Sequence, residues 1–191
     1  MLSVVIATNE SERTLVPTLA ALVPGATAGL IREVIVADTG SRDATAEVAD
    51  IAGCRIVVSD APLGARLKEA VEHARAPWLM FLAAGMVLEP GWVMETNRLI
   101  DEASQGAGEA MAAVFRPMAR VAQPERPARE MLILLGQMLG RLPPSRGLVI
   151  AKTLYQALGG HRPDTQEPDA DLLRRVGRRR IVRLRSGAVA I

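Results

Sequence analysis

The first half of the chain alternates between short apolar runs and stretches in which apolar residues recur every three or four positions. The apolar runs have the length of buried strands and occupy 2–8, 34–37, 55–58 and 78–82, and the first three of them are rich in Val and Ile. The stretches between them have helical spacing and predict helices over 13–23, 44–52 and 62–74. Strands that alternate with helices in this order predict an α/β fold, with a mostly parallel sheet covered by helices on both faces.

Polar and turn-forming residues mark the boundaries of these elements. Asn9 and Ser11 precede the first helix and are suited to cap it. Pro24-Gly25 is expected to end that helix. After residue 92 the pattern is less regular: it predicts strands at 112–115, 148–151 and 180–184, and helices at 91–104, 128–141, 152–158 and 169–176.

Composition narrows the class of protein. The chain has 191 residues, of which 49% are hydrophobic and 23% charged, as in an ordinary globular domain. The net charge of +2 gives no reason to expect nucleic acid as a partner. Cys54 is the only cysteine, so neither a disulfide within the chain nor a cysteine-based metal site is expected. The sequence shows no signal peptide and no membrane span, and a cytoplasmic location is expected.

Candidate chemistry lies where the predicted strands end. In parallel α/β sheets, ligands bind at the carboxyl ends of the strands. Here those ends carry Thr8-Asn9, Asp38, Ser59-Asp60 and 83–85. A carboxylate such as Asp38 is an acceptor suited to the imide N–H of a nucleobase, and the following Gly40-Ser41 turn exposes backbone amides.

Four segments, in this order along the chain, resemble the sequence pattern of family 2 glycosyltransferases. The first two are Val4–Glu10 and Val36–Thr45, which resemble the opening strand and the Asp-Asp-Gly-Ser segment of that family. The third, Pro62–Trp92, contains the buried strand and the Pro-Gly-Trp that follows it. The fourth joins Leu158-Gly159-Gly160-His161 to 169–175, and is similar to Leu-Gly-Gly-Phe followed by Glu-Asp-x-Asp-Leu.

This resemblance implies a GT-A, Rossmann-like fold in a single domain over 1–191, with a nucleotide-binding half (1–92) and an acceptor-side half (93–191). It implies transfer of a sugar from a nucleotide-diphosphate donor, most simply a UDP-sugar, to a glycan or lipid-linked acceptor. Asp38 would contact the base, and Asp169 would be the catalytic base. The residues implied in donor binding are Thr8, Asn9, Asp38, Gly40, Ser41, Arg66, Ala83 and Gly85.

The chain departs from the family pattern at its metal motif. Ala83 and Gly85 stand where the family has the two aspartates of Asp-x-Asp, so a divalent metal is doubtful and no metal ligand is assigned. Arginines are candidates to hold the diphosphate instead. They are Arg66, Arg146, Arg174, Arg175, Arg178, Arg179 and Arg180.

Structural explanations compete with each of these roles. Asp38 and Asp43 could simply build a turn and cap the next helix, and Asp169 could be a favourable charge at a helix N-terminus. The arginines could form a solvated basic face. His161 is expected to pack or meet solvent, because nothing near it in the sequence completes a triad or a metal site.

Three functions remain open at this point. The first is an active glycosyltransferase with weak or no metal dependence. The second is a catalytically inactive module that binds a nucleotide, a glycan or a protein. A dinucleotide-binding domain ranks last, because no Gly-x-Gly-x-x-Gly follows the first strand. The apolar helix predicted at 128–141 could be buried, form a homodimer, or contact the inner face of the membrane.

Overall fold

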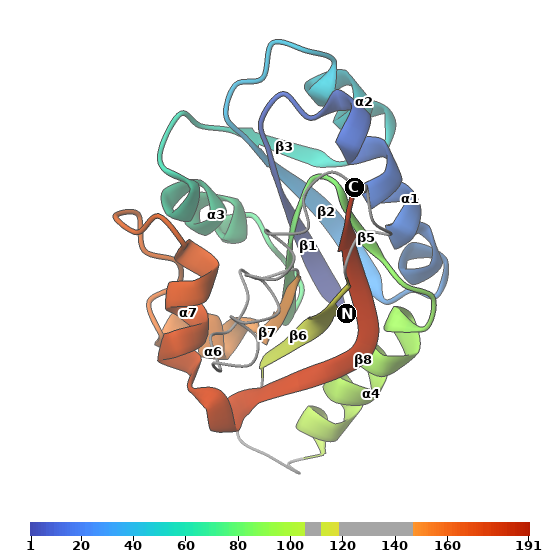
Figure 1. Ribbon diagram of the computed structural model, residues 1–191, viewed down its shortest axis with the longest axis vertical. Helices are drawn as coiled ribbons and strands as arrows, with labels where there is room; N and C mark the ends of the chain where they lie inside the picture. Colours follow the sequence, from blue (N-terminus) through green and yellow to red (C-terminus); the bar gives the residue numbers. More distant parts are fainter. Residues whose placement is uncertain (106–111, 119–146) are drawn as a thin grey trace, which may run out of the picture.

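The computed structural model describes residues 1–105, 112–118 and 147–191, and its elements follow the predicted α/β order (Figure 1). The strands are β1 (Leu2–Thr8), β2 (Ile31–Asp38), β3 (Arg55–Val58), β4 (Trp78–Ala83), β5 (Met86–Leu88), β6 (Ala112–Pro117), β7 (Leu148–Ala151) and β8 (Ile181–Ala190). The helices are α1 (Glu12–Thr27), α2 (Thr45–Ile51), α3 (Leu63–Glu72), α4 (Trp92–Ser104), α6 (Lys152–Ala157) and α7 (Pro168–Val176), with a 3-10 turn η1 (Arg178–Arg180).

The strands form one sheet in the order β3-β2-β1-β4-β7-β6-β8-β5. Strands β1 to β4 pair in parallel, and β6 pairs in parallel with β8. The pairs β4–β7, β6–β7 and β5–β8 are antiparallel. The predicted class, a mostly parallel sheet in an α/β fold, is confirmed.

The core surrounds β1, which lies between β2 and β4 and is buried along nearly its whole length. Right-handed crossovers place helices on both faces of the sheet. Helices α1 and α2 pack together on one face, and α3 is in contact with α7 on the other (Figure 1). This arrangement leaves the carboxyl ends of β1, β2 and β4 at one edge of the sheet.

The first helix is longer than its sequence indicates. The prediction that Pro24-Gly25 ends it is wrong, because α1 continues to Thr27. The ring of Trp92 packs on this turn so closely that a Cβ added at Gly25 would lie 2.4 Å from it. The indole N–H of Trp92 also donates to the carbonyl oxygen of Ala21 (3.1 Å). A contact from α4 therefore holds the helix together past a proline that lacks an N–H.

The start of α1 also differs from the prediction. Ser11 occupies the N-cap position, but its side chain makes no capping hydrogen bond and instead binds the backbone of Asn9. The carboxylate of Asp43 accepts a hydrogen bond from the N–H of Glu12 (3.0 Å). A side chain 31 residues away therefore caps the helix that Asn9 and Ser11 were expected to cap.

The end of the chain forms more sheet than predicted. The strand expected at 180–184 runs over Ile181–Ala190, and β5 was not predicted at all. Glu89 secures this edge, because its N–H donates to the Gly187 carbonyl while its carboxylate accepts from the Gly187 N–H (2.6 Å). The helix expected at 128–141 lies outside the described residues.

Candidate functional site

The carboxylate of Asp38 lies at the carboxyl end of β2, next to the end of β1, and is 2% exposed. It accepts four hydrogen bonds: from the Thr8 hydroxyl (2.7 Å), the Gly40 N–H (2.8 Å), the Ser41 N–H (2.6 Å) and the Ser41 hydroxyl (2.6 Å). A carboxylate offers about four acceptor positions, so these donors occupy them. The structure thus brings Thr8, Asp38, Gly40 and Ser41 together, with the Asp38 side chain holding its own turn in place.

These contacts change the acidity of Asp38. Burial by itself would raise its pKa, but the hydrogen bonds from Ser41, Thr8 and the Gly40 N–H outweigh burial and lower the pKa below its ordinary value of 3.8. A carboxyl group with a lowered pKa in the folded state stabilises the fold above its unfolded pKa. That contribution is lost as the pH falls from 3.8 through the folded value.

We expect Asp38→Asn to lower the free energy of unfolding by about 1–3 kcal/mol at pH 7, because an amide leaves part of this donor set unpaired. The difference from the parent protein should narrow at pH 3, because this pH lies below the ordinary pKa of 3.8, where the stabilisation from the lowered pKa is already being lost. Urea unfolding of both proteins at the two pH values measures this. Asp60→Asn, at an exposed carboxylate, is the control. An equal difference at both pH values would contradict the prediction.

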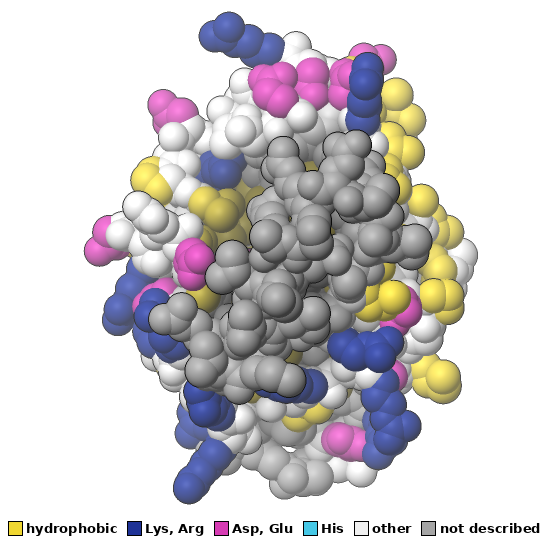
Figure 2. Space-filling view, viewed as in Figure 1, with side chains coloured by type: hydrophobic (Ala, Val, Ile, Leu, Met, Phe, Trp, Pro, Cys, Tyr) yellow, Lys and Arg dark blue, Asp and Glu magenta, His cyan; other side chains and the backbone are white. Residues whose placement is uncertain are grey.

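The loops that follow β1 and β2 hold each other through reciprocal hydrogen bonds, which we call the loop clasp. The Arg42 N–H donates to the Glu10 carboxylate (2.9 Å), and the Glu10 N–H donates to the Ser41 hydroxyl (2.8 Å). The Ala44 N–H donates to the Glu12 carboxylate (3.1 Å), in return for the bond from Glu12 to Asp43. Acidic side chains gather at this end of the molecule in the space-filling view (Figure 2).

An accessible polar pair stands beside the buried Asp38. The Thr39 hydroxyl donates to the side-chain oxygen of Asn9 (2.9 Å), and Asn9 is exposed. Asn9 was a candidate from the sequence, whereas Thr39 was taken only as part of a turn. Its position directly after a strand-end aspartate is the signal that would have identified it.

Arg66, on α3, reaches the same sheet edge from the other face. It is 6% exposed, and its Nη1 donates to the carbonyl oxygen of Thr8 (3.2 Å). Its Nε is buried and has no hydrogen-bond partner within the described ranges. Burial lowers the pKa of Arg66 and the charge of Asp38 raises it, but an arginine stays protonated. A buried cation with an unpaired donor therefore lies at the end of β1.

Strand β4 ends at Ala83, which is exposed, and the turn that follows contains Gly85, which is buried. The N–H of Gly85 binds the Thr14 carbonyl (3.0 Å) and the Thr18 hydroxyl (2.9 Å) of α1. Gly85 has a φ of +89°, and a Cβ added there would lie 3.3 Å from the carbonyl oxygen of Ile191. This backbone suits glycine, and the turn supplies no side-chain oxygen at either position.

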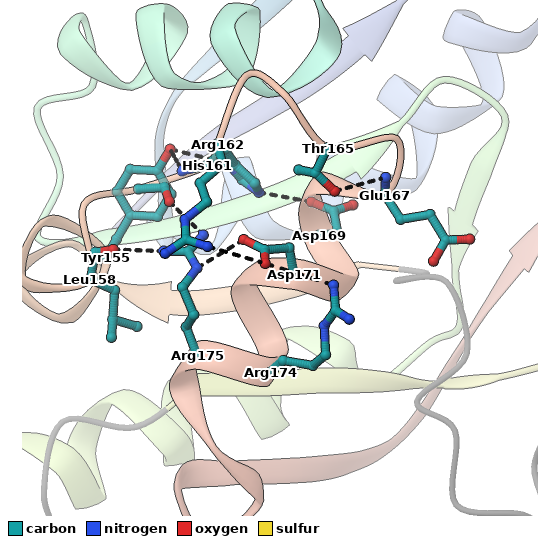
Figure 3. Close-up of polar contacts among 11 residues, drawn as sticks. Tyr155, Leu158, His161, Arg162, Thr165, Glu167, Asp169, Asp171, Arg174 and Arg175 are labelled. Atoms are coloured by element: carbon teal, nitrogen blue, oxygen red, sulfur yellow. Dashed lines mark hydrogen bonds and ion pairs between the residues drawn. The ribbon is translucent and has the colours of Figure 1, made fainter.

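A second polar cluster joins α6, α7 and the loop between them (Figure 3). The ring of His161 lies between Tyr155 and Asp169: its Nδ1 is 3.0 Å from the Tyr155 hydroxyl, and its Nε2 is 2.9 Å from the Asp169 carboxylate. The His161 side chain is fully buried, whereas that of Asp169 is 29% exposed. His161 packs in the interior, as one of the two expectations had it, and the fold also gives its ring two polar partners, Tyr155 and Asp169, that the sequence did not indicate.

The two parts of the site meet where α3 touches the loop after His161. A Cβ added at Gly64 would lie 2.0 Å from the carbonyl oxygen of Arg162. Gly64 is two residues before Arg66, on the same helix. The absence of a side chain at Gly64 therefore sets how closely the Arg66 region and the His161–Asp169 region approach each other.

Other candidate arginines have structural partners. Arg175 donates to the Asp171 carboxylate (2.9 Å), and to the carbonyl oxygens of Leu158 (2.6 Å) and Gly160 (2.7 Å), where it secures the end of α6. Arg174 is exposed and lies 3.7 Å from Asp171. Arg178–Arg180 form η1, which follows the C-terminal end of α7, whereas the loop with His161 precedes the N-terminal end. Arg146 lies outside the described residues.

Across the described ranges, no group of three or more His, Cys, Asp or Glu residues is arranged to hold a metal ion. Within the same ranges, no helix is both long and apolar enough to cross a membrane.

A Rossmann-like α/β domain with polar residues gathered at its strand ends defines a class of nucleotide-binding folds. The sequence profile described as glycosyl transferase family 2 matches residues 3–143, and the chain belongs to this family. No curated protein matches the chain.

Solved structures of glucosyl-3-phosphoglycerate synthase from Mycobacterium tuberculosis share this fold. Its complex with Mn²⁺, UDP and glucosyl-3-phosphoglycerate is 22% identical, with a TM-score of 0.67, over 96% of this chain and 68% of that one. The complex with Mn²⁺, UDP-glucose and phosphoglyceric acid is 20% identical, with a TM-score of 0.69, over 96% and 68%. The complex with Mn²⁺, UDP-glucose and glycerol 3-phosphate is 23% identical, with a TM-score of 0.68, over 96% and 69%. The predicted GT-A fold is confirmed.

Proposed function

We propose that this chain transfers a sugar from a nucleotide-diphosphate donor, most simply a UDP-sugar, to the hydroxyl group of an acceptor, with little or no dependence on a divalent metal. The observation that carries the proposal is Arg66: a buried guanidinium at the end of β1 whose Nε has no partner in the described part of the chain. Burying a cation without a full set of acceptors is costly, and an anionic ligand such as a diphosphate would supply them.

The donor's base would lie over the ends of β1 and β2. Because the Asp38 carboxylate is occupied by its own turn, we assign direct contact with the base to the accessible Asn9–Thr39 pair. Asp38 then contributes by fixing the Gly40-Ser41 backbone. The solved complexes of the similar synthase with UDP and with UDP-glucose support the choice of a UDP-sugar for this chain.

The reaction would be a displacement at the anomeric carbon of the donor sugar. The acceptor oxygen forms the new bond to that carbon, the bond to the diphosphate oxygen breaks, and Asp169 takes the proton of the acceptor hydroxyl. The positive charge of Arg66 would offset the charge that develops on the departing nucleoside diphosphate.

The metal that the family resemblance implies does not fit the residues present here. Ala83 and Gly85 offer no side-chain carboxylate to a divalent metal, and the backbone at Gly85 disfavours any side chain. We therefore assign the stabilisation of the diphosphate to arginine. The similar synthase has been solved with Mn²⁺, so the metal requirement is a difference to be tested.

Calorimetric titration of UDP, GDP and UDP-glucose, each with and without manganese, tests this proposal. We expect UDP to bind with the same affinity with and without manganese. In Arg66→Met that affinity should fall roughly 10- to 100-fold, because the substitution removes hydrogen bonds from a charged group. Lys68→Met is the matched control, since Lys68 is an exposed cation on the same helix. Failure of every nucleotide to bind, with or without manganese, would overturn the proposal.

A second candidate function is an inactive domain that binds a nucleotide, a glycan or a protein partner. The turn at 83–85 favours it, because it lacks the acidic side chains of the family pattern. UDP binding without any sugar transfer would support this second function. Several expectations from the sequence stay predictions. They are a lipid-linked acceptor, contact of segment 128–141 with a membrane, a homodimer, a cytoplasmic location, and the division into a nucleotide-binding half (1–92) and an acceptor-side half (93–191).

A further inference from the structure

The side chain of His161 is fully buried at a position that the proposed reaction does not yet use. Its ring packs edge-on against Phe81 of β4, with ring centres 4.7 Å apart, and against Tyr155, with ring centres 5.4 Å apart. Gly160 has a φ of +72°, and a Cβ there would lie 2.9 Å from the Tyr155 ring. The backbone can therefore pass close over the tyrosine and turn His161 into the interior.

The hydrogen bonds around the ring assign its tautomer. The backbone N–H of His161 donates to the Tyr155 hydroxyl oxygen (3.1 Å). The proton of that hydroxyl is therefore available for a hydrogen bond to the ring Nδ1 of His161 (3.0 Å). Nδ1 is then an acceptor, and Nε2 carries the ring proton. The Nε2–H group in turn donates a hydrogen bond to the Asp169 carboxylate (2.9 Å).

Tyr155 is suited to remain a donor in this chain of bonds. Burial raises the pKa of its hydroxyl to about 12, and the nearby charge of Asp169 acts in the same direction. The hydroxyl therefore keeps its proton at any pH at which the protein would work.

We propose that His161 is a positioning residue for Asp169: Tyr155 fixes the imidazole as the Nε2–H tautomer, and that N–H orients the Asp169 carboxylate toward the acceptor hydroxyl. This inference rests on the proposed function, in which Asp169 is the base. A packing role alone would need only an aromatic ring over Phe81, whereas here every polar atom of the buried ring has a partner.

The first test is spectroscopic and needs no activity. The chain has two histidines, so nitrogen-15 labelling of histidine in a His73→Asn protein leaves the ring of His161 as the only signal. We expect a single neutral Nε2–H tautomer in that protein, and a mixture of tautomers after Tyr155→Phe. Asp169→Asn should shift the Nε2 resonance. An Nδ1–H tautomer, or a mixture before Tyr155 is changed, would overturn the inference.

The second test is kinetic. His161→Phe keeps the ring volume but removes the donor, and we expect kcat to fall roughly 10- to 100-fold with the KM for the donor unchanged. His161→Gln can place an N–H near the position of Nε2 and should restore most of kcat, whereas His161→Asn is too short and should not.

A double substitution separates positioning from packing. His161→Phe should have no further effect on kcat in an Asp169→Asn background, because the group it positions is already lost. Equal kcat values for His161→Phe and His161→Gln, or additive losses in the double variant, would overturn the inference. If the parent protein transfers no sugar, the proposed function fails, and the nitrogen-15 spectra alone decide whether His161 positions the carboxylate.

Discussion

Asp169→Asn is expected to reduce the rate of sugar transfer by roughly 10²- to 10⁴-fold, the contribution usual for a general base. The amide has nearly the shape of the carboxylate but cannot accept the proton of the acceptor hydroxyl. Because Asp169 lies on α7 and not on the loops after β1 and β2 to which the base is assigned, donor binding measured by titration should change little.

The same substitution must be distinguished from a loss of stability. Asp169 lies in the first turn of α7, where a negative charge favours the helix by about 0.3–1 kcal/mol. An effect of that size would be visible in thermal unfolding but would not reduce kcat a hundredfold. Asp164→Asn is the matched control, since Asp164 is an exposed carboxylate in the loop that precedes α7. If the Asp169→Asn variant transfers sugar at the rate of the parent protein, Asp169 is not the base.

Gly64→Ala is expected to lower the free energy of unfolding by about 1–3 kcal/mol, the cost of forcing extra volume into a packed interior. Helix propensity alone predicts the opposite, because alanine is favoured over glycine in a helix interior by about 1 kcal/mol. The added Cβ would lie 2.0 Å from the Arg162 carbonyl oxygen, so the backbone next to His161 must move.

Chemical denaturation of Gly64→Ala and of Ala65→Gly provides a matched pair. For Ala65→Gly, helix propensity should determine the result, and the substitution should lower the free energy of unfolding by about 0.5–1 kcal/mol. We expect both variants to be destabilised, and only Gly64→Ala to disturb the ring signals of His161. If Gly64→Ala is more stable than the parent protein, the loop that contains Arg162 moves at little cost, and its contact with α3 does not fix the position of the loop.

The central strands β1, β4 and β7 were predictable because each is a single apolar run that is buried along nearly its whole length. The ranges of β1 and β7 match the prediction residue for residue, and so does that of β3, although β3 is an edge strand with Arg55 and Val58 exposed. Such runs carry their own signal, since nearly every side chain must leave water. The same reasoning placed Thr8 and Asp38 at one sheet edge, because the ends of adjacent parallel strands meet there.

The strands β5 and β8, at one side of the sheet, were less predictable, because they depend on partners that are distant in the sequence. Strand β5 has three residues and pairs with β8, about one hundred positions later in the chain. Strand β8 has no regular alternation of exposed and buried residues and contains Ser186 and Gly187, so the sequence of its later part resembles a loop. Helix α1 passes Pro24 for a similar reason: Trp92, which supports that turn, comes from another helix.

The site was predictable where it follows strand ends and not where it depends on side chains meeting across loops. Arg66 was one of several arginines considered for the diphosphate and the one assigned to donor binding, and its burial now distinguishes it from the others. Tyr155 and Asp169 lie six residues before and eight residues after His161, spacings that match no regular element. Only the fold of the loop between α6 and α7 brings the three together.

The loop clasp has a consequence for protein engineering. Glu10, Glu12, Ser41 and Asp43 each receive a backbone N–H from the opposite loop, so neither loop carries its own complete set of partners. A chimaera that imports the first loop from another transferase, while keeping the second, would leave amides on both sides without acceptors. Residues 9–12 and 39–45 therefore form one exchange unit, and changing donor preference by grafting requires that both segments come from the same parent.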